Sequence, residues 1–166
     1  MSASVSLRAN TGTDAGTESS AITGIDFISA DNATNSLANR QANPIVIPVT
    51  GQHYSYEKWL TLKIDEAPDN EITNVLFWGP DNYPAGTEVY CGVTATGATP
   101  TEDGSTVATS KADTEAIETN KLTWDTGPLT SQGETTDFLV LQLEVESHAS
   151  PGNWAQQTFY YSYDEI

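Results

Sequence analysis

Short segments in which apolar and polar residues alternate recur along the chain, and turn residues separate them. The clearest segment is "TTDFLVLQLEVES", residues 135–147. In an extended strand one face would carry Leu139, Leu141, Leu143 and Val145, and the other Phe138, Val140, Gln142 and Glu144. A period of two residues is that of a β-strand with one face toward the core. The pattern therefore predicts a strand here, with its odd-numbered side chains buried.

The segment "SYEKWLTLKI", residues 55–64, alternates in the same way. One face would carry Tyr56, Lys58, Leu60, Leu62 and Ile64, and the other Trp59, Thr61 and Lys63. Shorter apolar runs predict further strands at residues 24–29, 44–49, 87–96 and 120–127, and between the Pro-Asp-Asn turns at 68–70 and 80–82. Prolines bound the run at 44–49, which therefore suits an edge strand. Residues 30–44 are polar and rich in asparagine, which predicts a loop.

The chain ends in an aromatic-rich segment, "WAQQTFYYSYDEI". Alternation places Phe159, Tyr161 and Tyr163 on one face, and this face would fill the core beside Leu139, Leu141 and Leu143. Tyr160 would lie on the opposite face, free to contact a partner. The segment is therefore predicted to be the last strand of the sheet.

About seven or eight short antiparallel strands separated by turns are typical of an all-β protein. We expect a single β-sandwich, Ig-like or jelly-roll-like, over residues 25–166. Residues 1–24 contain few large apolar side chains and many Ser, Thr and Gly. They predict an extended N-terminal arm with a short strand at Ser4–Leu7. Residues 1–22 are expected to be disordered or loosely packed in the isolated protein and ordered in the particle.

Charge limits the classes of partner. The 166 residues include 6 Lys and Arg against 23 Asp and Glu, a net charge of −17, and seven carboxylates but no Lys or Arg follow Lys121. Such a chain repels nucleic acid and anionic membranes, because both require positive charge opposite them. The acidity favours solubility, or a surface that meets a basic partner or faces away from DNA. We find no apolar stretch of membrane-spanning length and no secretory signal pattern, so we expect a chain made in the cytoplasm.

Catalytic chemistry has little support in the sequence. His53 and His148 lie far apart in predicted loops, and no nucleophile-elbow pattern accompanies them. Cys91 falls on the apolar face of its strand, which indicates a small buried side chain. No cofactor motif is present. Asp and Asn gather in turns without the spacing of a calcium loop, so no metal site is predicted, although a weak surface calcium site stays open. Trp59, Trp78, Trp124 and Trp154 could stack on sugars or pack in the core.

Three segments carry a resemblance to a known class of protein. They are "TGIDFISADNATNSLANRQANPI" (Thr23–Ile45), "SYEKWLTLKI" (Ser55–Ile64) and "PGNWAQQTFYYSYDEI" (Pro151–Ile166). They resemble small β-sandwich virion structural proteins of tailed phages, which are encoded among head and neck genes and close with a similar aromatic ending. The likeness covers most of the chain after residue 22 and contains no catalytic residue.

The resemblance implies a non-enzymatic protein of the virion, assembled in the host cytoplasm. Its expected role is capsid decoration, in which it binds the outer surface of the shell formed by the major capsid protein. The alternatives are a neck- or tail-associated virion protein and a glycan-binding adhesion module. Its partners would be the major capsid protein or neighbouring virion proteins, and a homo-oligomer is allowed, with a trimer favoured. The candidate partner contacts are Val5, Leu7 and Arg8 in the arm and Tyr160 in the last strand.

Overall fold

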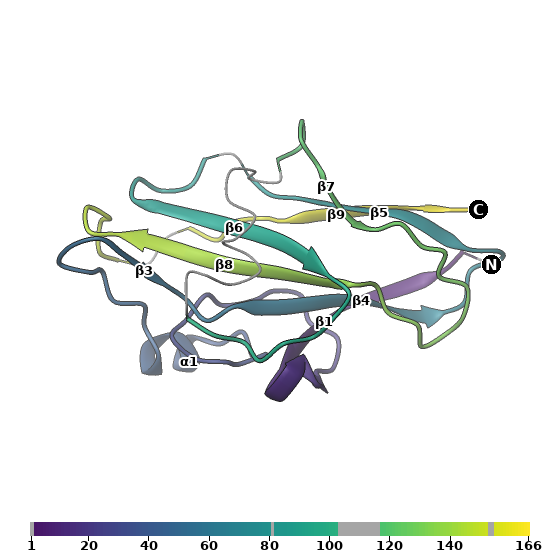
Figure 1. Ribbon diagram of the computed structural model, residues 1–166, viewed down its shortest axis with the longest axis horizontal. Helices are drawn as coiled ribbons and strands as arrows, with labels where there is room; N and C mark the ends of the chain where they lie inside the picture. Colours follow the sequence, from purple (N-terminus) through teal and green to yellow (C-terminus); the bar gives the residue numbers. More distant parts are fainter. Residues whose placement is uncertain (1, 81, 103–116, 153–154) are drawn as a thin grey trace.

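A computed structural model describes residues 2–80, 82–102, 117–152 and 155–166 (Figure 1). These residues contain nine strands, one short α-helix and one 3-10 turn. The elements are β1 (Ser4–Thr11), η1 (Thr13–Ala15), β2 (Thr17–Glu18), α1 (Leu37–Ala42), β3 (Gln52–Tyr54), β4 (Lys58–Glu66), β5 (Ile72–Trp78), β6 (Thr87–Thr94), β7 (Leu122–Asp125), β8 (Phe138–Glu146) and β9 (Tyr160–Glu165). The predicted all-β class is confirmed.

The strands form two antiparallel sheets that pack as a sandwich. The larger sheet has six strands in the order β2-β1-β4-β8-β3, and β6 pairs with the other side of β8. The β6–β8 ladder runs without a break from Thr87 opposite Val145 to Thr94 opposite Phe138. The smaller sheet has the order β7-β5-β9. It forms the second layer of the single sandwich domain.

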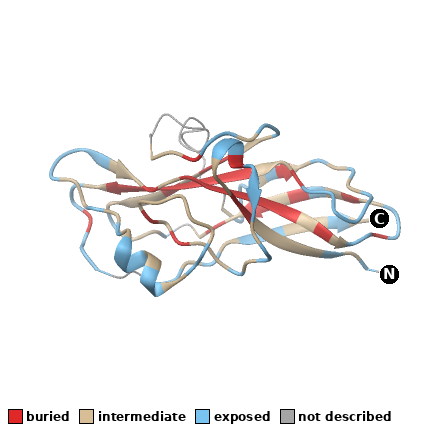
Figure 2. Cartoon of the chain, turned by 90° about the horizontal axis from the view of Figure 1, so that it is seen from below, coloured by how far each residue is buried: buried red, intermediate tan, exposed pale blue. Residues whose placement is uncertain are grey.

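The main core lies between the two sheets. From β8 it receives Leu139, Leu141, Leu143 and Val145, and from β4 it receives Leu60, Leu62 and Ile64, the two sets that the alternation predicted. The small sheet contributes Phe77, whose ring lies 6.2 Å from Trp124 edge-on and 5.8 Å from Phe159 in a stacked arrangement. Figure 2 shows these buried positions as a nearly continuous stripe along the long strands. Burial of this apolar area is the main stabilising contribution to the sandwich.

The outer face of β8 is also covered, which the sequence did not predict. Every residue from Leu139 to Val145 is buried, including Gln142 and Glu144. Trp59, Val140 and Ala15 form a second apolar cluster on this face. The amide of Gln142 is satisfied because its Nε2 donates to the Ser55 carbonyl at 2.8 Å. The polar side chains are therefore buried with partners instead of facing solvent.

The N-terminal segment belongs to the large sheet, in contrast to the arm predicted over residues 1–24. Strand β1 pairs with β4 from Ser4 to Asn10, and the Ile22 amide donates to the Leu7 carbonyl at 2.9 Å. Val5 and Leu7 pack against the main core. The low apolar content of this segment did not reveal that it is part of the sheet, because backbone hydrogen bonds to β4 also hold it in place.

Residues 24–49 differ most from the prediction. No strand forms at 24–29 or 44–49, and α1 lies inside the segment predicted to be a loop. Ser36 caps this helix, because its Oγ accepts from the Asn39 amide at 3.2 Å. In the run 44–49 Ile45 and Ile47 still pack against the core, while the Val49 side chain is 96% exposed. The apolar alternation is present, but none of the described strands pairs with this proline-bounded run.

The terminal segment is the strand β9, as predicted, and it pairs with β5. Phe159 and Tyr163 pack against the main core. Tyr161, expected in the core with them, is instead 41% exposed. The reason is the position of β9 at the edge of the small sheet, where a side chain on the inner face can extend past the layer.

The placement of β1 predicts a difference between two substitutions in that strand. Leu7→Asp should lower the free energy of unfolding by about 3 kcal/mol, because it removes apolar packing and directs a carboxylate toward the core. Ser4→Asp, at an exposed position of the same strand, should change it by less than about 0.5 kcal/mol. Urea unfolding measures both. Equal, small effects would mean that β1 is a loose arm after all.

Lys58 is a buried amine at the start of β4, 4% exposed. Its Nζ donates to the carbonyls of Ala30 at 3.0 Å and Asn32 at 3.3 Å. Burial lowers the pKa of Lys58 to about 8, although Asp31 and Asp26 act in the opposite direction. The unfolded chain, in which a lysine keeps its ordinary pKa, therefore binds more protons than the folded chain between pH 8 and about 10.

Stability should consequently rise with pH over this window. The free energy of unfolding should increase by about 2 kcal/mol from pH 8 to pH 10 relative to that of Lys58→Met, which has no proton to lose. The measurement should stop near pH 10. Folding raises the pKa of Tyr54 to about 12, so above pH 10 this residue ionises first in the unfolded chain, which lowers the free energy of unfolding. If the free energies of unfolding of the two proteins changed equally with pH, Lys58 would not have a lowered pKa in the folded protein.

Candidate functional site

The outer face of the small sheet carries a row of three side chains from three strands or their ends. Inner positions of β5 fill the core with Phe77, so the next residue, Trp78, faces outward. Tyr160 of β9 lies directly opposite Trp78 in the ladder. Lys121 precedes β7, on the other side of β5. We call Lys121, Trp78 and Tyr160 the aromatic row.

The members of the aromatic row are in contact. The rings of Trp78 and Tyr160 are stacked, with centroids 5.6 Å apart and planes 17° from parallel. The Lys121 Nζ lies over the Trp78 ring, 4.1 Å from its centroid. Because β7 and β9 flank β5 on opposite sides, Lys121 and Tyr160 approach the indole from opposite sides. Both faces of Trp78 are therefore occupied, while Tyr160 is 49% exposed.

The rest of this face combines Leu76 with polar side chains. Leu76 lies opposite Ser162 on β9 and Thr123 on β7, one step along the strands from the aromatic row. Further along, the Asn74 Nδ2 donates to the Asp164 Oδ2 at 2.8 Å. This face therefore has its aromatic and apolar groups at one end and a hydrogen-bonded carboxylate at the other.

Lys121 differs from the other described basic residues in its partners. Arg8, Arg40 and Lys63 form ion pairs with Asp65, Asp26 and Glu18, with the shortest N–O separation at 2.6 Å for Lys63. Lys58 is buried against carbonyls. Within the described part of the chain, the exposed Lys121 ammonium contacts the Trp78 ring and no carboxylate. It is the one described cation that keeps its hydrogen-bond donors available.

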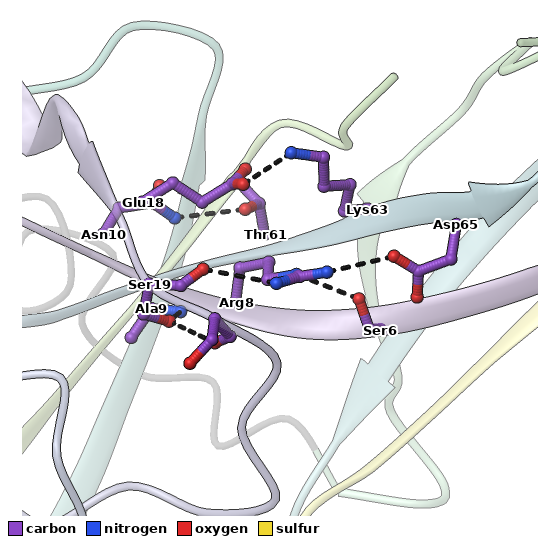
Figure 3. Close-up of polar contacts among 10 residues, drawn as sticks. Ser6, Arg8, Ala9, Asn10, Glu18, Ser19, Thr61, Lys63 and Asp65 are labelled. Carbon is purple, nitrogen blue, oxygen red and sulfur yellow. Dashed lines mark hydrogen bonds and ion pairs between the residues drawn. The ribbon is translucent and has the colours of Figure 1, made fainter. Parts of the chain in front are cut away.

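Of the four predicted contact residues, Tyr160 alone lies in this site. Val5 and Leu7 pack against the core, which gives them a structural position instead of an exposed one. Arg8 lies on the outer face of the large sheet, where its Nη2 donates to the Asp65 Oδ1 at 3.0 Å and its Nε to the Ser6 Oγ at 2.9 Å (Figure 3). Hydrogen bonds from Ser6 and then Arg8 lower the pKa of Asp65.

The candidate catalytic residues have separate environments. The His53 Nδ1 lies 3.1 Å from the Val46 carbonyl oxygen, and the His148 Nδ1 lies 3.0 Å from the Glu146 Oε2. Cys91 is buried, as predicted. No group of three or more His, Cys, Asp or Glu side chains suited to a metal ion occurs among the described residues. No helix in the described ranges is long and apolar enough to cross a membrane.

A second outer surface is an acidic hollow of about 180 Å³ on the large sheet. Its lining consists of Gly86, Thr87, Glu88, Glu144 and Glu146. The Tyr90 hydroxyl donates to the Glu88 Oε2 at 3.0 Å beside it. Burial, followed by the hydrogen bond to Glu88, raises the pKa of Tyr90. The tyrosine therefore stays protonated and acts as a donor to a carboxylate that lines the hollow.

The tryptophans offer little surface to a sugar. Trp59 and Trp124 are each 1% exposed, and Trp154 lies outside the described residues. Trp78 is half-buried, and its ring is in contact with Tyr160 and with the Lys121 ammonium. A sugar ring stacks on a free aromatic face, so Tyr160 is the remaining stacking position in this site.

Comparisons with protein-family models, with curated proteins and with solved structures return no match to this chain. The interpretation of the site therefore depends on its geometry and charge.

The aromatic row should contribute little to folding. Tyr160→Ala should lower the free energy of unfolding by about 1 kcal/mol, the value of one aromatic pair. Phe77→Ala, from the inner face of the paired strand, should cost about 3–5 kcal/mol. Chemical unfolding followed by circular dichroism compares them. A loss for Tyr160→Ala as large as that for Phe77→Ala would make the row part of the core.

Proposed function

We propose that this protein is a non-enzymatic structural protein of a tailed-phage virion, a capsid decoration protein that binds the outer surface of the major capsid protein shell. The observation that carries the proposal is the aromatic row on the outer face of the small sheet. Trp and Tyr are among the side chains that most often dominate protein–protein contacts. A rigid sandwich that presents them on paired strands suits attachment to a preformed surface.

The resemblance of three segments to tailed-phage virion proteins supports the same role. In the structure, Ser55–Ile64 includes most of β4, and Pro151–Ile166 includes β9 with Tyr160. The resembling segments therefore include a central strand of the large sheet and one strand of the proposed contact surface. Of the aromatic row, the likeness includes Tyr160.

Charge favours a location outside the shell. At −17, the chain would be repelled by packaged DNA and is suited to the outer surface. A neck- or tail-associated position would fit the same chemistry. A glycan-binding module is less favoured, because the buried or covered described tryptophans leave Tyr160 as the stacking ring.

Copy number separates capsid decoration from the neck and tail position. Quantitative mass spectrometry of purified virions of the encoding phage should find this protein in numbers comparable with the major capsid protein. A few copies per particle would assign it to the neck or tail, and its complete absence would contradict a virion role.

A further inference from the structure

We propose that the aromatic row binds a carboxylate side chain of the partner protein, with Lys121 as the ion-pairing residue and Tyr160 as the apolar contact beside it. This inference rests on the proposed function and names the chemistry of the contact. It concerns the one described cation that is not already used within the fold.

The first step is the state of Lys121. Its ammonium is held over the Trp78 ring at 4.1 Å, and its side chain is exposed. A cation on an aromatic face is attracted to the ring but keeps the N–H donors that point away from the ring for another partner. Lys63, by comparison, is paired to Glu18 at 2.6 Å. Lys121 therefore offers a positioned positive charge that an incoming anion can bind without breaking an ion pair to any of the described residues.

The second step is pre-organisation. Trp78 and Tyr160 are opposite residues of a β-ladder, and their rings stack at 17°. Stacking on one side and the lysine on the other restrict the indole before any partner arrives. Little side-chain conformational entropy is then lost on binding, and this smaller entropic cost increases the affinity of the contact. Tyr160, half exposed at the end of the row, supplies apolar area next to the charge.

The third step is the identity of the anion. The whole chain carries −17, so an extended polyanion such as nucleic acid or an anionic membrane is repelled over distances beyond the row. A single carboxylate on a protein can reach Lys121 at short range without bringing further negative charge. An acidic sugar would have only the Tyr160 ring to stack on, because Tyr160 and Lys121 already contact Trp78, and this makes it the less favoured anion. The occupant that fits is an Asp or Glu beside an apolar side chain.

The test uses particles of the encoding phage assembled without this protein, to which purified full-length variants are added. The variants are Lys121→Gln, Lys121→Arg, Tyr160→Ala and the matched control Lys63→Gln on the large sheet. Thermal melts confirm that each is folded. Lys121→Gln and Tyr160→Ala should each weaken binding by about tenfold or more, while Lys121→Arg and Lys63→Gln should stay within about threefold of the original.

Salt gives a readout that a structural role of Lys121 would not change. Raising the salt concentration should reduce the difference in affinity between the original protein and Lys121→Gln, because screening weakens the ion pair. Equal binding by all variants overturns the inference and leaves the proposed function in place. Failure of the original protein to bind particles overturns both. Inhibition of binding by free glucuronic acid, lost in Tyr160→Ala, assigns the row to a sugar acid and also overturns the inference.

Discussion

The structure depends on the burial of β8 on both of its faces. This strand lies between β6 on one side and β4 and β3 on the other, so its backbone is paired along its length. Its inner face packs against the small sheet and its outer face against the cluster around Trp59. If this strand shifted by one residue, its leucines would turn to the outer face and Gln142 and Glu144 would turn into the core. That constraint sets the register of the large sheet.

The candidate site follows from the packing of the opposite layer onto that core. Phe77 and Phe159 stack within the sandwich, and each is followed in sequence by a residue of the aromatic row. Strand alternation then turns Trp78 and Tyr160 to the outer face. Their pairing in the ladder brings the rings together. The same side-chain period that fills the core therefore presents the two rings of the contact surface, while Lys121 lies just before β7.

Alternation of apolar and polar residues predicted the strands that have one apolar face. It did not predict the burial of polar side chains that are covered by residues distant in the sequence. The inward residues of β4 and β8 and the terminal strand could be identified from alternation. Gln142 and Glu144 could not be identified as buried, because their cover comes from residues distant in the sequence. Strand β1 was underestimated, since its stability depends on hydrogen bonds to β4. The aromatic row was only partly predictable. Tyr160 has an outward position in its strand, but its contacts with Trp78 and Lys121 depend on a strand order that a single sequence does not specify.

The central claim is that the outer face of the small sheet contacts the virion. Hydroxyl-radical footprinting of the free and the particle-bound protein tests it directly, since aromatic side chains are oxidised where they are accessible. Binding should protect Trp78 and Tyr160 and leave the oxidation of Tyr54 and Tyr90, on the large sheet, unchanged. Protection of Tyr54 and Tyr90 with unchanged oxidation of Trp78 and Tyr160 would place the contact on the opposite layer and contradict this account.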